Sequence, residues 1–392
     1  MRLGDCCKTN LHTYSDKEKW SMIRYLDTGS ITEGRIDEIQ TLYPGVDKIP
    51  SRARRKASVG DILFSTVRPN QKHYGIIEAG TENLLVSTGF TVVTVDTTIA
   101  DPYFIYYYLT QSSVIESLQA IAEQSTSTYP SIKPSDIEDI ELDLPELETQ
   151  KKIGSTLRML DRKIALNEEI NDNLEQQAQA IYHERFETVS PNDLPSDWRI
   201  VTLGEVATIS NKSFNPLKEP EILLEHYSIP AFDEARFPVF ELSTSIKSNK
   251  FIIDASCFMI SKLNPTTKRV WKPYCLTGNA VCSTEFIVYK AKDKTITDFL
   301  YSVIDSNSFS DFMCSHVTGS TGSRQRTTPS DTLSYELILP SEDELAEFQS
   351  LVSPMYAQIR INAIENDRLK RLRDSLLPKL MSGEIDVSTI QL

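Results

Sequence analysis

An internal duplication constrains this chain more than any other feature, because two copies of one unit are expected to fold alike. An offset of 196 positions aligns residues 60–65 with 256–261, and residues 87–90 with 283–286. An offset of 195 then aligns Pro134 with Pro329 further along both copies. The sequence therefore predicts two related units of about 200 residues each.

Each copy divides into a mixed part and a helical part. The mixed parts, 1–145 and 191–340, alternate β-branched and aromatic runs with Gly, Pro and Asn, as strands and turns do. Each also holds one helical stretch, at 102–121 and, more weakly, at 297–314. The helical parts are a central segment, 146–190, and a distal segment with a C-terminal tail, 341–392.

The helices themselves are expected at 146–187 and 341–381. A helix of about 40 residues is roughly 60 Å long, too long for one compact domain. We predict an α+β fold, in which two mixed α/β domains are joined by two long antiparallel coiled-coil helices as a pseudo-two-fold internal repeat.

The two helical segments carry matching heptads, with apolar residues at alternating spacings of four and three. In the first segment the heptad positions are Ile153, Leu157, Leu160, Ile164, Asn167, Asn171, Leu174, Ala178 and Ile181. In the second they are Phe348, Val352, Met355, Ile359, Asn362, Asn366, Leu369, Arg373 and Leu376. A buried asparagine at such a position lowers stability but fixes the register.

Antiparallel pairing predicts Asn167 opposite Asn366 and Asn171 opposite Asn362. The alternative is that each helix packs only on its own globular domain. Pro354 is expected to kink the second helix or to lie in its first turn, because proline interrupts helical hydrogen bonding.

The cysteines and the apolar runs indicate the cellular compartment. The six cysteines form no C-x-x-C pair and have no histidine at zinc-ligand spacing. We therefore expect reduced cysteines in a cytoplasmic protein with no bound metal. No apolar run is long enough to span a bilayer.

Several stretches, taken in their order, carry a resemblance to a known family. The helical ones are 144–147 (LPEL), 150–153 (QKKI), 171–175 (NDNLE), 366–369 (NDRL) and 376–385 (LLPKLMSGEI). Those of the mixed parts are 60–63 (GDIL), 194–198 (LPSDW), 202–206 (TLGEV) and 227–233 (YSIPAFD). No single motif is decisive, but with this order the chain resembles the specificity subunits of Type I restriction–modification systems over essentially its whole length.

The resemblance implies a DNA-recognition subunit that takes part in DNA methylation and phage defence. Each mixed part would be a target-recognition domain for one half of a bipartite, asymmetric site in double-stranded DNA, and the helices would set the spacer. Two methyltransferase subunits would dock on the helical region and methylate adenine N6 with S-adenosylmethionine. Restriction subunits, where present, would cleave with ATP and magnesium, so this chain would hold no catalytic residue and no cofactor.

Candidate DNA contacts in the first domain fall in two basic runs. The first is expected in a loop rich in Pro and Ser, and it contains Lys48, Arg52, Arg54, Arg55 and Lys56. The second follows the strand-like residues 61–65 and contains Arg68, Asn70, Lys72, His73 and Tyr74. Arg and Lys bind phosphates or guanine edges and Asn binds adenine, whereas the alternative is a solvated loop.

The second domain has a cluster at the matching place. It contains Lys262, Asn264, Lys268, Arg269, Trp271 and Lys272. A polar, glycine-containing loop at 319–326 supplies further candidates, namely Thr321, Ser323, Arg324, Gln325 and Arg326. Its counterpart at 124–129 has no arginine but offers Tyr129.

The net charge of −14 opposes DNA binding, since phosphate affinity comes from Lys and Arg. The bases gather in the runs above, which partly resolves this conflict. The acidic net charge nevertheless leads us to expect weak DNA binding by the free chain and tighter binding with methyltransferase partners attached. The sequence has no G-x-x-x-x-G-K-[ST] loop, and Asn215-Pro216 and Asn264-Pro265 lack the Pro-Tyr of an adenine methyltransferase. The competing hypotheses are a divergent stand-alone methyltransferase or nuclease, and a coiled-coil adaptor that binds only proteins.

Overall fold

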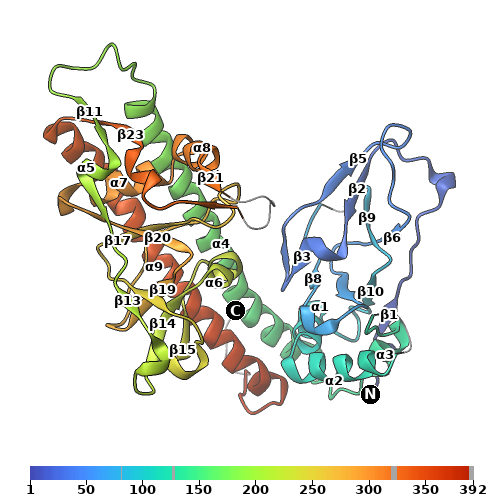
Figure 1. The fold of residues 1–392 in the computed structure, drawn as a ribbon. Helices are drawn as coiled ribbons and strands as arrows, with labels where there is room; N and C mark the ends of the chain where they lie inside the picture. The colour runs from blue at the N-terminus through green and yellow to red at the C-terminus, as the bar shows by residue number, and fades with distance from the viewer. Residues whose placement is uncertain (81, 126–128, 319–324, 388–392) are drawn as a thin grey trace. The chain divides into compact units, whose positions relative to one another are not determined.

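The computed structural model describes residues 1–392 except 81, 126–128, 319–324 and 388–392. The chain folds as two units (Figure 1). Unit 1 comprises Met1–Lys163 and Leu369–Leu392, and unit 2 comprises Ile164–Arg368. The division falls inside both long helices, so each helix contributes one part to each unit.

Unit 1 is built on two four-stranded sheets. The first has the order β1 (Cys7–Thr9), β10 (Phe90–Val95), β7 (Ile62–Ser65), β8 (Tyr74–Ile76), and all its pairings are antiparallel. The second has the order β5 (Gln40–Leu42), β2 (Ile23–Leu26), β9 (Leu84–Ser87), β6 (Ala53–Lys56), in which β2 and β9 run parallel. A small hairpin joins β3 (Ile31–Thr32) to β4 (Arg35–Ile36). The helices are α1 (Pro102–Leu109), α2 (Ser112–Glu123) and α3 (Pro134–Glu138).

Unit 2 repeats this plan with additions. Its first sheet has the order β12 (Ala207–Ile209), β20 (Phe286–Ala291), β17 (Cys257–Ser261), β18 (Val270–Trp271). Its second has the order β13 (Ser213–Phe214), β16 (Lys250–Ile252), β19 (Ala280–Ser283), β14 (Leu223–Tyr227), β15 (Val239–Leu242). Two further pairs are β11 (Arg199–Thr202) with β23 (Glu336–Leu339), and β21 (Val317–Thr318) with β22 (Arg326–Thr327). The helices are α5 (Leu203–Val206), α6 (Ile229–Ala235), α7 (Thr297–Ile304) and α8 (Asn307–Ser315).

The duplication seen in the sequence extends to the strand register. Phe90 pairs with Ser65 between β10 and β7, and Phe286 pairs with Ser261 between β20 and β17, at the same offset of 196. In both units one parallel pair, β2 with β9 or β14 with β19, lies inside the second sheet. The expected repeat and the α+β fold class are therefore confirmed.

The helical stretches of the mixed parts differ from the prediction. Each was expected as one helix, at 102–121 and 297–314, but each is two helices separated by a short break. Asp101 caps α1, accepting the Phe104 backbone N–H at 2.9 Å, with Pro102 in the first helical position. A second start at Ser112 produces α2. The period of the apolar residues does not reveal this break.

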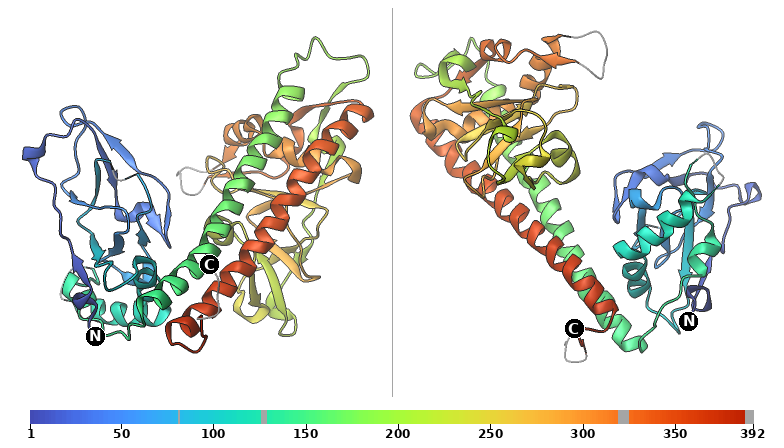
Figure 2. Two further views of the ribbon diagram at one scale, coloured as in Figure 1. Left: turned by 180° about the vertical axis from the view of Figure 1, so that it is seen from behind. Right: turned by 60° about the horizontal axis from the view of Figure 1, so that its bottom comes forward.

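The long helices have nearly the predicted bounds. They are α4 (Leu147–Tyr182), which continues into a π-helical turn at His183–Glu187, and α9 (Glu342–Met381). Pro354 lies well inside α9 and not in its first turn, so that alternative is wrong. In unit 2, the parts of α4 and α9 that belong to it lie side by side (Figure 2).

The asparagines of the heptads pair across the helices of unit 2. Asn167 Nδ2 donates to Asn366 Oδ1 at 2.8 Å, and Asn362 Nδ2 donates to Asn171 Oδ1 at 2.8 Å. Asn167, Asn362 and Asn366 are all buried. These are the two pairs that the antiparallel register predicts, and the alternative of helices packed only on their own domains is wrong.

Both units draw part of their cores from the ends of the long helices. In unit 1, Leu377 and Leu380 of α9 are buried with Ile153 and Leu157 of α4. In unit 2, Tyr182 at the end of α4 and Phe348 near the start of α9 join the aromatic core.

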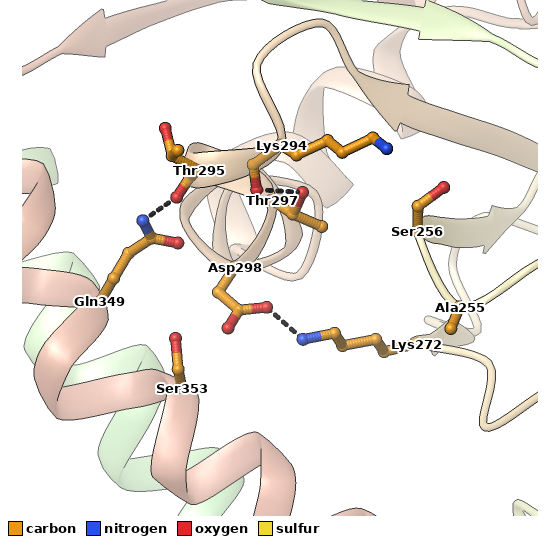
Figure 3. Close-up of a pocket in the computed structure, with 9 residues that line it drawn as sticks. All are labelled: Ala255, Ser256, Lys272, Lys294, Thr295, Thr297, Asp298, Gln349 and Ser353. Atoms are coloured by element: carbon orange, nitrogen blue, oxygen red, sulfur yellow. Dashed lines mark hydrogen bonds and ion pairs between the residues drawn. The ribbon is translucent and has the colours of Figure 1, made fainter.

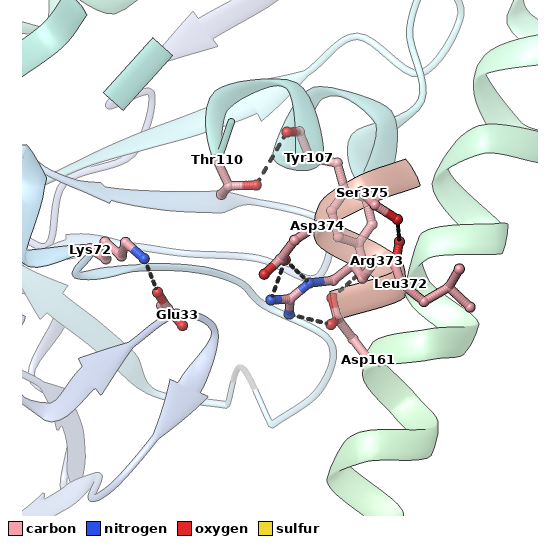
Figure 4. A network of polar contacts seen from close by, with 9 residues as sticks. All are labelled: Glu33, Lys72, Tyr107, Thr110, Asp161, Leu372, Arg373, Asp374 and Ser375. Carbon is pink, nitrogen blue, oxygen red and sulfur yellow. Dashed lines mark hydrogen bonds and ion pairs between the residues drawn. The ribbon is translucent and has the colours of Figure 1, made fainter. Parts of the chain in front are cut away.

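A polar network accompanies the apolar contacts of α9 in unit 1 (Figure 4). Arg373 Nη1 contacts Asp161 Oδ1 at 2.8 Å, and Asp161 accepts the Tyr107 hydroxyl at 2.6 Å. Arg373 also contacts Asp374. The arginine at a heptad position, unexpected in an apolar seam, is thus paired with acids.

Candidate nucleic-acid interface

The first basic run does not form the expected loop. Residues 53–56 form strand β6, which pairs with β9 and also contacts the preceding segment, where Tyr14 N donates to Arg54 O at 2.7 Å. Lys48 and Arg52 precede this strand and are exposed. The prediction of a loop is therefore wrong for Arg54, Arg55 and Lys56, because the pairing with β9 holds these residues in a sheet.

The strand residues have their own partners or partial burial. Lys56 pairs with Glu18 and lies 5.2 Å from the Trp20 ring. Burial lowers the pKa of Arg55, and its Nη1 atom has no hydrogen-bond partner among the described residues. Arg54 lines a cavity of about 440 Å³ beside Tyr14 and Trp20. The exposed cations of this run are thus Lys48 and Arg52.

The second run surrounds a turn after β7. Arg68 and Asn70 are exposed, whereas Lys72 pairs with Glu33 at 2.5 Å (Figure 4). His73 Nδ1 lies 2.7 Å from Ile31 O. Tyr74 is 6% exposed and packs against the rings of Phe64 and Tyr106. Tyr74 is therefore removed from the candidate contacts, because its side chain is part of the core.

The structure brings this turn together with the segment that follows α2. Val67 bridges to Ser131, and Arg68 N donates to Pro130 O at 3.0 Å. The Arg68 guanidinium lies 5.1 Å from the ring centroid of the exposed Tyr129, a cation–π contact. Two candidate regions that are about 60 residues apart in the sequence thus form one surface.

Unit 2 joins the equivalent segments in the same way. Leu263 bridges to Arg326, Asn264 N donates to Gln325 O at 2.9 Å, and Thr327 N donates to Lys262 O at 3.1 Å. Thr321, Ser323 and Arg324 lie outside the described residues. Each domain therefore presents a paired-loop surface, formed by 66–72 with 129–132 in unit 1 and by 262–268 with 325–327 in unit 2.

The cations of the second cluster are largely neutralised by acids. Three pairs join Lys268 to Asp305 at 3.0 Å, Arg269 to both carboxylate oxygens of Asp233 at 2.5 and 2.9 Å, and Arg326 to Glu285 at 3.0 Å. Lys262 makes no ion pair with a residue that the structure describes. The sequence does not reveal these pairs, because each acid is distant in the chain from the cation that it neutralises.

Two other members of that cluster lie elsewhere. Trp271 is 3% exposed and packs against Tyr227 and Phe232, so it cannot contact DNA. Lys272 pairs with Asp298 in an open depression between α7 and α9, whose volume is about 690 Å³ (Figure 3). Lys272 is therefore also removed from the paired-loop surface.

The helix pair of unit 2 has two unlike faces. Asp172 and Glu175 of α4 face Arg236, whose Nη1 atom lies 2.8 Å from Glu175 Oε2. Gln179 Nε2 donates to Ser302 O at 3.2 Å. Arg360 of α9 likewise donates to Tyr274 O. In heptad terms, with the seam at positions a and d, these helix residues occupy positions b and e, so this face is covered by the globular part.

The opposite face, at positions c and g, carries exposed apolar side chains. Leu166, Ile170 and Ile361 are 50%, 36% and 55% exposed. Ile170 is at a g position, and Leu166 and Ile361 are at c positions, which lie beside g on the helix surface. In an antiparallel pair the g positions of both helices flank the same edge of the seam, so these residues share one side. In Figure 2 (left) the two helices stand in front of the strands of unit 2. The heptad pattern does not reveal this face, because positions a and d describe only the seam between the helices.

Among the described residues, no group of His, Cys, Asp and Glu is arranged to hold a metal ion. Within the same residues, no helix is both long and apolar enough to cross a membrane.

The chain is similar to known proteins over most of its length. Residues 3–176 match the family model of the Type I restriction modification DNA specificity domain. The Type I restriction enzyme HindI specificity subunit of Haemophilus influenzae is 25% identical, over 98% of both chains. The MjaIX specificity subunit of Methanocaldococcus jannaschii is 24% identical, over 84% of this chain and 79% of that protein.

A solved structure shows the same fold. It is the Type I restriction-modification system S subunit from M. genitalium, with a TM-score of 0.56 and 16% identity, over 99% of this chain and 96% of that chain. Residues 3–176 therefore match a Type I specificity domain, and the chain is similar, along almost its whole length, to the specificity subunits of Type I restriction enzymes.

Proposed function

We propose that this chain is the DNA-recognition subunit of a Type I restriction–modification complex, in which each paired-loop surface contacts one half of a bipartite, asymmetric site. The observation that carries the proposal is the duplicated surface itself. Two loops far apart in sequence meet at the same place in both domains, with Arg68 N on Pro130 O in one and Asn264 N on Gln325 O in the other. The chain is a non-catalytic subunit, as its named relatives are specificity subunits.

The domain limits follow from this function. The target-recognition domains are 1–145 and 191–340, and the helical segments 146–190 and 341–392 act as the element that sets the spacer. The asparagine pairs support this role, because a helix pair with one fixed register has one fixed length.

The exposed apolar face of the helix pair is the docking surface for methyltransferase subunits. Leu166 and Ile361 are equivalent residues of the two repeats, at an offset of 195, and both are at least half exposed. Apolar side chains grouped on an exposed face favour protein contacts. A face with two equivalent anchors suits two copies of one partner subunit.

Methylation mapping tests the recognition function. The chain would be co-expressed with the methyltransferase subunits of its own system, in a host without DNA methylation, and N6-methyladenine would be mapped across the genome. We expect one motif with two specified parts and an unspecified spacer, absent when this chain is omitted. Methylation of the same motif without the chain would contradict the proposal, as would a chain that methylates DNA alone.

Charge substitutions test the docking face. Leu166→Lys with Ile361→Lys should abolish co-purification with the methyltransferase subunits, because two charges would be buried in an apolar contact. Val239→Lys is the matched control, since Val239 is 44% exposed but belongs to β15 and not to the helix pair. Retained co-purification of the double variant would refute the docking face.

A further inference from the structure

The turns that follow β7 and β17 have the same hydrogen bonds in the two domains. In unit 1, Ser65 Oγ donates to Val67 O at 3.0 Å and accepts Val67 N at 3.2 Å. In unit 2, Ser261 Oγ donates to Leu263 O at 3.1 Å and accepts Leu263 N at 3.2 Å. The two turns therefore hold the next residue in equivalent positions.

That next residue is Arg68 in one domain and Asn264 in the other, and both adopt the left-handed backbone conformation. Their φ angles are 49° and 53°, and each precedes a proline. This conformation is costly for arginine, and such strain persists only where the surroundings fix it. Here the backbone N–H is fixed by the opposite loop, at Pro130 O or Gln325 O.

Neither side chain is committed to a hydrogen bond or an ion pair within the described part of the chain. Arg68 is exposed, and its guanidinium has no ion pair or hydrogen bond with a described residue, only the Tyr129 ring at 5.1 Å. The Asn264 amide likewise has no hydrogen bond to the described part of the chain. Nearby Lys268 and Arg269, by contrast, are held by acids. One rigid backbone position therefore offers a different free side chain in each domain.

The chemistry of the two side chains distinguishes bases. A guanidinium donates two parallel hydrogen bonds to guanine O6 and N7, whereas a carboxamide accepts a hydrogen bond from adenine N6 and donates one to adenine N7. We propose that positions 68 and 264 are equivalent specificity-determining positions, with Arg68 selecting a guanine in one half-site and Asn264 an adenine in the other. This inference rests on the proposed function.

Exchange of the side chains tests the inference in the intact complex. Arg68→Asn, Asn264→Arg and the unchanged chain would each be co-expressed with the methyltransferase subunits, and the methylated motif mapped. We expect Arg68→Asn to alter one guanine position in one half-site, with discrimination there reduced roughly 5- to 150-fold, the value of one bidentate base contact. Asn264→Arg should alter one adenine position in the other half-site.

The control and the contrary outcomes separate base contacts from phosphate contacts. Arg52→Asn removes the same charge from an exposed residue outside the turn, so it should weaken methylation of all sites without altering the motif. If Arg68→Asn behaves in that way, Arg68 binds phosphate and the inference is overturned. If the unchanged chain gives a bipartite motif and both variants give the same motif, the inference is overturned and the proposed function stands. If the unchanged chain gives no motif, the proposed function itself is overturned.

Discussion

The buried asparagine layer of unit 2 allows a quantitative test of how the helix pair is held. Asn167 and Asn366 are 1% and 6% exposed, and Asn167 Nδ2 donates to Asn366 Oδ1 at 2.8 Å and to Glu365 Oε2 at 2.7 Å. Asn366→Ala removes one of these acceptors from a buried amide. The loss of such a bond costs about 2 kcal/mol, which would lower the Tm of a unit of this size by about 4–8 °C.

The double replacement should behave differently from the single one. Asn167→Leu with Asn366→Leu removes both amides, so neither is left buried without its partner. Exchange of a buried polar pair for apolar side chains of similar size is nearly neutral or stabilising. We therefore expect the double variant to unfold at or above the temperature of the unchanged protein, while losing one of its two register-fixing pairs.

Stability and register need separate assays. Hydrogen exchange of α4 and α9 peptides from unit 2 reports local stability, with Asn173→Ala on the exposed side of α4 as a control that should change it by less than about 0.5 kcal/mol. Register is reported by a disulfide between Asn171→Cys and Asn362→Cys, whose yield should fall when Asn167 and Asn366 are both Leu. A double variant less stable than Asn366→Ala, or an unchanged disulfide yield, would refute this reasoning.

Three further predictions concern other parts of the chain. Lys48→Ala with Arg52→Ala should weaken DNA binding by the complex and reduce the slope of log K against log salt by about 0.9 for each phosphate that is no longer neutralised, measured by fluorescence anisotropy; an unchanged slope would exclude both residues from the interface. Leu380→Ala should destabilise unit 1 by about 2–5 kcal/mol in denaturant unfolding, because Leu380 is 3% exposed in its core; a value below about 1 kcal/mol would contradict the core contribution of α9. Burial lowers the pKa of His226 below its ordinary 6.5, partly opposed by its hydrogen bond to a glutamate, so the folded state resists protonation and stability should fall as the pH falls through 6.5. His226→Gln should remove that dependence, of up to about 1.4 kcal/mol per pH unit, whereas the exposed control His12→Gln should retain it.

The sequence predicted the features that depend on regular spacing. The repeat offset, the bounds of the long helices and the Asn167–Asn366 pair all follow from residues recurring at fixed intervals, which secondary structure translates directly into geometry. The helix break near Ser112 was missed, because a break that keeps the apolar face in place leaves the period unchanged. The alternative that placed Pro354 in the first turn of the second helix was wrong, since α9 begins at Glu342 and includes a proline that local propensity disfavours.

The candidate interface was predicted less well, because charge in a sequence does not reveal its partners. Arg269 and Asp233 are 36 residues apart, and only the fold brings them into a bidentate pair. Tyr74 and Trp271 follow basic residues closely but point into the core, since successive residues of a strand face opposite sides. Position within the repeat was the better guide to geometry, because it aligns Asn264 with Arg68 and the structure places the two residues in equivalent turns.

The neutralised cations of unit 2 also explain how an acidic chain can serve as a DNA reader. Lys268, Arg269 and Arg326 are each held by a carboxylate, so phosphate contacts by them would first require those pairs to be broken. The domain therefore contributes little non-specific affinity, which depends on cations free to displace counterions. On the inference above, hydrogen-bonding groups such as the Asn264 amide would discriminate between bases. We therefore expect affinity to come largely from partner subunits, and a reader that binds weakly alone would not remain on DNA sequences that it does not recognise.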